Sequence, residues 1–156
     1  MNNEKWEDYA IKAVKEQSDR KDFIASFFLC SAFVEHYCRT RLFTFLTAHR
    51  SVELIKVKDK RTKELRKVFI WSKMKKIIWK MNQRKIIDVG LLVGAWNKEL
   101  YDQLTKFNSD RNKLVHKYEN LLQILKKDEK KVRSIIELGL SLLNDIKSGY
   151  VNRKKG

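Results

Sequence analysis

Hydrophobic residues in the first third of the chain recur three or four positions apart, the spacing that gives a helix one apolar face. This spacing predicts an amphipathic helix over residues 4–17, followed by a break at Ser18–Lys21. Asp22 is a suitable N-cap for a second helix, in which apolar residues continue to Leu46 and cover most faces. We therefore expect residues 22–46 to form the central helix of the fold.

The segment 51–70 follows a different pattern and leaves two structures open. Several β-branched residues lie on both sides of the polar stretch Asp59–Lys63, which is typical of a β-hairpin around residues 52–69. A continued helix is the alternative. The β-branched residues are Val52, Ile55, Val57, Val68 and Ile70.

Helical spacing returns in the second half of the chain. It predicts helices over residues 71–84, 92–107 and 129–147. Asn108, Ser109 and Asp110 are residue types that often cap the start of a helix. We therefore expect one more helix to begin there and to continue through Leu122.

The composition supports one all-α domain. The chain has 156 residues, a length typical of a single domain, and 43% of them are hydrophobic, which is enough for a core. Proline is absent and glycine occurs five times, so residues that end helices or turn strands are scarce. We expect one domain over residues 1–156, with a helical bundle of about five helices over 5–147 and a short basic C-terminal tail.

Nothing in the sequence predicts export or membrane insertion. No apolar run approaches the ~18 residues of a membrane span, and the first residues lack the basic-then-apolar pattern of a signal peptide. Cys30 and Cys38 lie in one predicted helix, about 12 Å apart along its axis, which is too far for a disulfide. These features predict a cytoplasmic protein without a membrane partner, in which both cysteines are small core residues.

The positive charge is concentrated in the middle of the chain. Thirty-five Lys and Arg against 19 Asp and Glu give +16 overall, and residues 50–86 alone carry fourteen basic against three acidic side chains. A field of this sign attracts polyanions. The segment predicts RNA contacts through Lys56, Lys58, Lys60 and Arg61, and the alternative is that the lysines are solvated helix faces. Trp71 and Trp79 would suit stacking against bases, but we expect both to lie in the core.

Several catalytic motifs are missing from the sequence. It lacks the P-loop, the dinucleotide-binding glycine motif, GxSxG, HExxH and CxxC, which excludes P-loop NTP hydrolysis, a structural zinc site and serine hydrolase chemistry. His36 and His49 have no companion ligands at metal spacing, so we expect structural or surface roles for both. No cofactor and no metal is predicted.

His116 has a different setting, because Arg111 and Asn112 precede it. On a continuous helix Asn112 and His116 differ in direction by about 40°, whereas Arg111 and His116 diverge by about 140°. Arg111 must then reach round the helix or lie on a less regular first turn. Arg supplies a permanent cation for a phosphate, and His titrates near neutral pH. These groups suffice to break an RNA phosphodiester if the 2′-hydroxyl is the nucleophile, and no metal ion is then required.

At these residues the sequence resembles the HEPN domains. Arg111, Asn112 and His116 match the RxxxxH signature of that family, in which the residue after Arg is commonly Asn. Glu35 is similar to the acidic position of the family's second helix, and the segment 74–92 is similar to the helix and turn that precede the motif in some branches. The resemblance covers roughly residues 5–147 and is specific at the motif.

The resemblance implies a helical bundle that forms a homodimer and cleaves RNA without a metal ion. It places Arg111, Asn112 and His116 in the catalytic cluster and gives Glu35 a supporting role. Tyr118 extends the match to RxxxxHxY, which is found in toxins paired with minimal nucleotidyltransferases, where the antitoxin adenylylates the Tyr. Lys117 departs from that branch, which usually has a small residue there. The resulting prediction is an endoribonuclease, a candidate toxin or defence effector with an antitoxin partner.

A non-catalytic interpretation of the same residues stays open. A buried Arg111 would pair with Glu35 and tie two helices together, with His116 hydrogen-bonded beside them. Tyr118 would then be an ordinary packing residue. In that case the chain is a helical module that binds nucleic acid or a protein partner.

Overall fold

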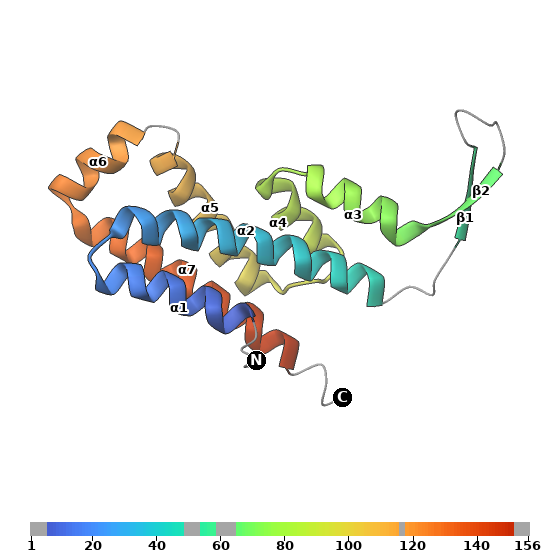
Figure 1. The fold of residues 1–156 in the computed structure, drawn as a ribbon, viewed down its shortest axis with the longest axis horizontal. Coiled ribbons are helices and arrows are strands. Elements are labelled where there is room, and N and C mark those ends of the chain that lie inside the picture. Colours follow the sequence, from blue (N-terminus) through green and yellow to red (C-terminus); the bar gives the residue numbers. More distant parts are fainter. Residues whose placement is uncertain (1–5, 49–53, 59–64, 116–117, 152–156) are drawn as a thin grey trace.

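The chain is built from helices, with one short β-hairpin between the second and the third helix along the chain (Figure 1). The computed structural model describes residues 6–48, 54–58, 65–115 and 118–151, with side chains over 8–48, 73–115 and 122–145. No helix within these ranges is long and apolar enough to cross a membrane. The helices are α1 (Trp6–Asp19), α2 (Phe23–Ala48), α3 (Ile70–Lys80), α4 (Gln83–Leu92), α5 (Lys98–Val115), α6 (Tyr118–Lys127) and α7 (Glu129–Val151).

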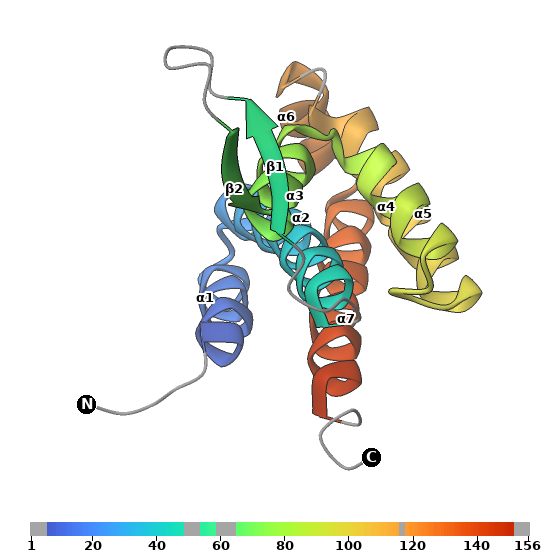
Figure 2. The same ribbon diagram turned by 90° about the vertical axis from the view of Figure 1, so that its right-hand side faces the viewer.

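Helix α2 lies at the centre of the fold, as its apolar faces predict. It packs against α1, α3, α4 and α7, and Figure 2 shows it nearly end-on with α1 to one side and α7, α5 and α4 to the other. Its first turn is capped by Asp22, whose Oδ1 accepts a hydrogen bond from the Ala25 N–H at 3.0 Å. The buried side chains of Phe27, Val34 and Leu42 form the middle of the core. The predicted central helix is therefore confirmed.

The segment after α2 forms the hairpin rather than a continued helix. Strands β1 (Leu54–Lys58) and β2 (Leu65–Phe69) pair antiparallel, with Leu54 opposite Phe69 and Lys58 opposite Leu65. Strand β2 runs directly into α3, and Figure 1 shows the hairpin beyond the end of the bundle. The β-branched pattern was thus the correct guide in this segment.

The predicted helix over 71–84 is two helices. Helix α3 ends at Lys80, and Asn82 caps α4 by accepting a hydrogen bond from the Lys85 N–H at 2.9 Å. An Asn side chain competes for backbone N–H groups and so favours a helix start over a helix interior. The periodicity of the apolar residues is almost unbroken across this join, which is why it predicted one helix.

The predicted helix over 92–107 is also wrong at its beginning, because residues 93–97 form a tight turn before α5. Trp96 is buried over Gly90, where a Cβ would collide with the indole ring, and its Nε1 donates to the Ile87 carbonyl at 3.0 Å. Gly94 has a φ of 77°, a conformation that other residues rarely adopt. Asn97 then caps α5 through its Oδ1.

Helix α5 passes without interruption through residues 108–110, so the helix start predicted there is wrong. Asn108 is buried, and the apolar residues Leu104, Phe107 and Leu114 continue one buried face across it. Packing of this face outweighs the capping preference of the three polar residues. Helix α5 ends at Val115, and α6 begins at Tyr118.

Helices α2, α5 and α7 approach closely around Gly139 of α7. A Cβ at this position would collide with Cys30 Sγ and would lie 2.8 Å from Phe107 Cε2. Cys30 and Cys38 are free and buried, and burial raises the pKa of each thiol to about 12. The prediction that both cysteines are core residues is confirmed.

Substituting Gly139 by Ala is expected to lower the free energy of unfolding by about 1–2 kcal/mol. Overpacking a core costs about 1–3 kcal/mol, and the collision with Cys30 Sγ and the 2.8 Å contact with Phe107 Cε2 place the cost in the upper part of this range, about 2–3 kcal/mol. The better helix propensity of Ala returns about 1 kcal/mol. Chemical denaturation of Gly139→Ala, Cys30→Ala and the double variant measures the effect. The double variant should recover part of the loss, since removing Sγ makes room. An unchanged or higher stability of Gly139→Ala would contradict the close approach.

Candidate functional site

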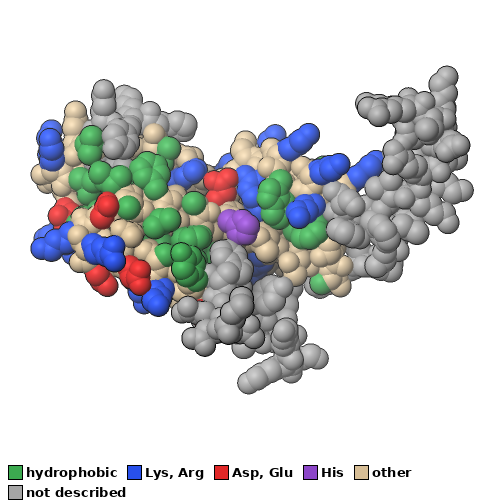
Figure 3. Space-filling model, in the orientation of Figure 1, with side chains coloured by type: hydrophobic (Ala, Val, Ile, Leu, Met, Phe, Trp, Pro, Cys, Tyr) green, Lys and Arg blue, Asp and Glu red, His purple; other side chains and the backbone are tan. Residues whose placement is uncertain are grey.

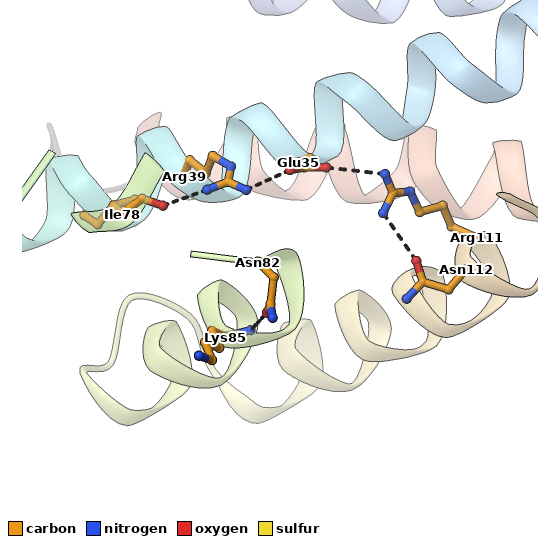
Figure 4. A network of polar contacts seen from close by, with 7 residues as sticks. All are labelled: Glu35, Arg39, Ile78, Asn82, Lys85, Arg111 and Asn112. Atoms are coloured by element: carbon orange, nitrogen blue, oxygen red, sulfur yellow. Dashed lines mark hydrogen bonds and ion pairs between the residues drawn. The ribbon is translucent and has the colours of Figure 1, made fainter. Parts of the chain in front are cut away.

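Arg111 lies in the last turn but one of α5 and faces α2. Its Nη2 lies 3.4 Å from Glu35 Oε2, and its Nη1 donates to Asn112 Oδ1 at 3.3 Å (Figure 4). The fold therefore brings together three of the predicted site residues, one of them 76 positions away along the chain. Arg111 does not lie on a first turn, so that part of the sequence prediction is wrong.

A second arginine, Arg39, shares the Glu35 carboxylate and was not singled out from the sequence. Its Nη2 lies 2.7 Å from Glu35 Oε1, and its Nη1 donates to the Ile78 carbonyl of α3 at 2.6 Å. The four-residue spacing of Glu35 and Arg39, with the acidic residue first, is the sequence signal for this helical ion pair. The bond to Ile78 has no such signal, because it joins α2 to a backbone oxygen of another helix.

The two arginines are held with different strength. Both contacts of Arg39 are short and its side chain is 12% exposed, whereas the contacts of Arg111 are near the outer limit for hydrogen bonds and its side chain is 26% exposed. Arg39 therefore has a structural role. Arg111 is the cation that retains hydrogen-bonding capacity, because each of its Nη atoms carries a second N–H besides the one directed at Glu35 or Asn112. Its Nε is buried and has no hydrogen-bond partner within the described residues.

The formal charges leave this cluster, Glu35, Arg39 and Arg111, with one positive charge in excess. A half-buried guanidinium with spare donors and incomplete neutralisation favours an anion, and a phosphate matches its forked geometry. Arg111 also reaches solvent, unlike a cation sealed in the core. The arrangement can therefore bind a phosphodiester and stabilise added negative charge on it.

The remaining predicted site residues are only partly described. His116 lies outside the described residues, directly after α5, and Tyr118 is the first residue of α6, with a side chain that is not described. Of the candidate RNA contacts, Lys56 and Lys58 belong to β1, whose side chains are also not described. Lys60 and Arg61 lie outside the described residues, as do His49 and the side chain of Trp71.

His36 and Trp79 occupy the surface. His36 is exposed on α2, with Nε2 3.3 Å from Thr40 Oγ1, in agreement with a surface role. Trp79 is 39% exposed, so the expectation that it lies in the core is wrong. Among the described residues, no three His, Cys, Asp or Glu side chains lie close enough together to hold a metal ion.

Comparison with known proteins was made in three ways. Models of protein families, curated proteins and solved structures all gave no match to this chain.

Replacing Glu35 by Gln is expected to lower the free energy of unfolding by about 1–3 kcal/mol, because hydrogen bonds to charged groups are worth about that much and two guanidiniums lose their shared anion. Thermal or chemical denaturation measures the loss. Asp88→Asn is the matched control, since Asp88 pairs with Arg84 on the surface and with Tyr101, and should lose less than about 1 kcal/mol. Equal effects of the two substitutions would show that the cluster is no stronger than a surface ion pair.

Proposed function

We propose that this protein is an endoribonuclease that cleaves RNA without a metal ion, using Arg111, Asn112 and His116 with support from Glu35. The observation that carries the proposal is the guanidinium of Arg111, which Glu35 and Asn112 orient but do not saturate. Four residues separate it from His116, the histidine of the RxxxxH motif. A phosphate cation and a group that titrates near neutral pH are the parts that the reaction needs.

In the proposed reaction the ribose 2′-hydroxyl attacks the adjacent phosphorus. His116 removes the hydroxyl proton, a bond forms between O2′ and phosphorus, and the bond from phosphorus to O5′ breaks as the leaving oxygen takes up a proton. Arg111 stabilises the extra negative charge of the pentacoordinate phosphorus, and Asn112 orients the substrate or the imidazole. The products are a 2′,3′-cyclic phosphate and a 5′-hydroxyl.

A homodimer is part of this proposal. One histidine cannot accept the 2′-hydroxyl proton and protonate the leaving oxygen at the same time, whereas two copies facing each other across a two-fold axis supply a base and an acid. In this form the site belongs to both protomers. RNA and a second copy of the chain are thus the proposed partners.

The proposal extends to a biological setting that its motif implies. Tyr118 is the candidate acceptor of an adenylyl group from an antitoxin, and the protein would act as a toxin or defence effector in the cytoplasm. Helix α6 begins at this residue, so a modification there would be close along the chain to His116.

The competing function is a non-catalytic module that binds nucleic acid or protein. It is favoured by the contacts of the cluster with three helices, since Glu35 and Arg39 join α2 to both α5 and α3. These contacts explain the presence of Arg111 by stability alone. Cleavage by the purified protein decides between the two functions.

Cleavage of single-stranded RNA in the presence of EDTA is expected for the wild-type protein, with loss of about 10²–10⁴-fold in His116→Ala and about 10²–10³-fold in Arg111→Met. The measurement is the rate of appearance of 2′,3′-cyclic phosphate ends. His36→Ala is the matched control, because it removes an exposed histidine outside the cluster and should leave the rate unchanged.

Three results would contradict the proposed reaction. Cleavage that requires magnesium, or that persists in His116→Ala, would rule out this mechanism. The absence of cleavage on a varied set of RNAs, with all variants folded, would favour the non-catalytic module.

Light scattering at micromolar concentration is expected to give twice the 18.7 kDa mass of one chain. The reason is the requirement for two histidines at one scissile bond. A mass of one chain under conditions in which the protein cleaves RNA would show that a single protomer contains the complete site.

A further inference from the structure

The exposed side of α3 carries four lysines without an acidic partner among the residues that the structure describes. Each is exposed, and within the described residues none of them pairs with a carboxylate. The sequence from 73 to 85 contains no Asp or Glu. The four are Lys73, Lys75, Lys76 and Lys80.

Elsewhere in the described structure, four exposed basic side chains pair with a carboxylate one turn away. These pairs lie on three other helices, and each leaves little net field around its helix face. The charges of the α3 lysines add to one another, and they lie beside an exposed indole. The pairs are Arg84–Asp88, Lys98–Asp102, Lys113–Asp110 and Arg133–Glu129.

The lysines and Trp79 share one side of α3. Positions 73, 76 and 80 fall within an arc of about 60° on a helix, and Trp79 and Lys75, one turn apart, lie about 60° and about 100° beyond its edge. Lys75 Nζ lies 5.6 Å from the centre of the Trp79 ring, and Phe43 of α2 supports the indole in an edge-to-face contact. An exposed indole that is fixed from behind is a platform for stacking a base.

The surface view shows where these charges lie. Figure 3 shows Lys and Arg side chains over the part of this face where α3 lies, beside exposed hydrophobic side chains. Over the other part of the face Lys and Arg side chains are mixed with Asp and Glu, and one acidic side chain lies near the middle of the view.

The position of α3 is fixed relative to Arg111. The Ile78 carbonyl accepts the hydrogen bond from Arg39, and Arg39 shares Glu35 with Arg111 (Figure 4). Ile78 is buried, so the exposed side of α3 is turned away from this bond and toward solvent. A chain bound along α3 would therefore lie on an element that the cluster itself holds in place.

We infer that the exposed side of α3 is a binding surface for single-stranded RNA, in which Lys73, Lys76 and Lys80 contact phosphates and Trp79 stacks against a base that Lys75 flanks. This inference deepens the proposed function, and it rests on that function for the choice of RNA as the polyanion. Single-stranded RNA is favoured over a duplex because an indole stacks on a base only when the base is unpaired and exposed.

The test measures binding separately from cleavage. The probe is a labelled 12-nucleotide RNA with 2′-O-methyl groups, which lacks the 2′-hydroxyl nucleophile and so stays intact. Its dissociation constant is measured at several salt concentrations for the wild-type protein and for a variant with Lys73, Lys75, Lys76 and Lys80 replaced by Gln. The matched control has Gln at Lys126, Lys127, Lys130 and Lys131, four exposed lysines near the junction of α6 and α7.

The α3 variant is expected to bind more weakly and to lower the slope of log affinity against log salt by about 2, since three of its lysines are proposed to contact phosphates and each such contact to a single strand contributes about 0.7. The α6–α7 control removes the same charge and should retain most of the slope. Trp79→Leu should weaken binding by about fivefold or more, whereas Tyr9→Leu, which removes the exposed Tyr9 of α1, should not.

Equal loss in the two lysine variants would overturn the inference, because binding would then depend only on net charge. Competition by an RNA duplex or by anionic lipid vesicles that is as strong as competition by the single strand would also overturn it, in favour of that partner. Binding with the expected pattern in a protein that cleaves no RNA would support the surface and contradict the proposed reaction. Cleavage with no effect of the α3 variant on affinity would do the reverse.

Discussion

The Glu35 carboxylate is the point at which three helices are joined. One of its oxygens pairs with Arg39 and the other with Arg111, and Arg39 continues the connection to the Ile78 carbonyl of α3. The carboxylate is about one-third exposed and the Arg39 side chain is 12% exposed, so these contacts lie in a less polar environment than pairs at the surface. Charged hydrogen bonds are stronger in such an environment, and an unpaired charge there is costly. The relative positions of α2, α3 and α5 therefore depend on this one side chain.

The two arginines differ in how firmly their hydrogen bonds hold them, and this difference separates a structural role from a proposed chemical one. Arg39 is held by two short bonds and its side chain is 12% exposed, which gives it a structural role. Arg111 makes longer contacts and its side chain is 26% exposed, so it combines a fixed position with the capacity to bind an anion through its Nη groups. Preorganised cations of this kind contribute to catalysis because they need no rearrangement as charge develops on the substrate. The same geometry also explains why a purely structural role competes with the catalytic one.

The positive charge of α3 lies on a helix that the Glu35–Arg39–Arg111 cluster contacts. Among the described residues, α3 carries four exposed lysines without an ion pair beside an exposed indole, while Arg84, Lys98 and Arg133 of other helices pair with a carboxylate one turn away. In the proposed function a positive surface on an element held by the cluster would bind the RNA strand, and phosphate contacts would position it without selecting its sequence. Binding and chemistry would then depend on different residues.

Much of this architecture follows from the sequence by itself. The length and apolar period of residues 23–46 determine a central helix, Asp22 determines its start, and the β-branched pattern allows the hairpin. The likeness of Glu35 and Arg111 to one family's motif placed both in a single cluster, and the structure shows them in contact. These features can be predicted from the sequence because each depends on spacing within a helix or strand, or on the chemistry of single side chains.

Tertiary packing decided the rest. The sequence at 108–110 favours a helix start, but the buried face through Phe107 and Leu114 keeps α5 continuous, since the free energy of burying that face exceeds the preference of a cap. Arg39 donates a hydrogen bond to the backbone carbonyl of Ile78. Every residue has a backbone carbonyl, so the sequence does not indicate which one will accept this bond. The residue type of Trp79 does not by itself determine whether the indole is buried or exposed. Its place in the fold, in edge-to-face contact with Phe43 of α2, comes from the packing of α3 against α2. Local patterns determine which elements form, whereas contacts between distant elements determine which polar groups are satisfied and which remain for a ligand.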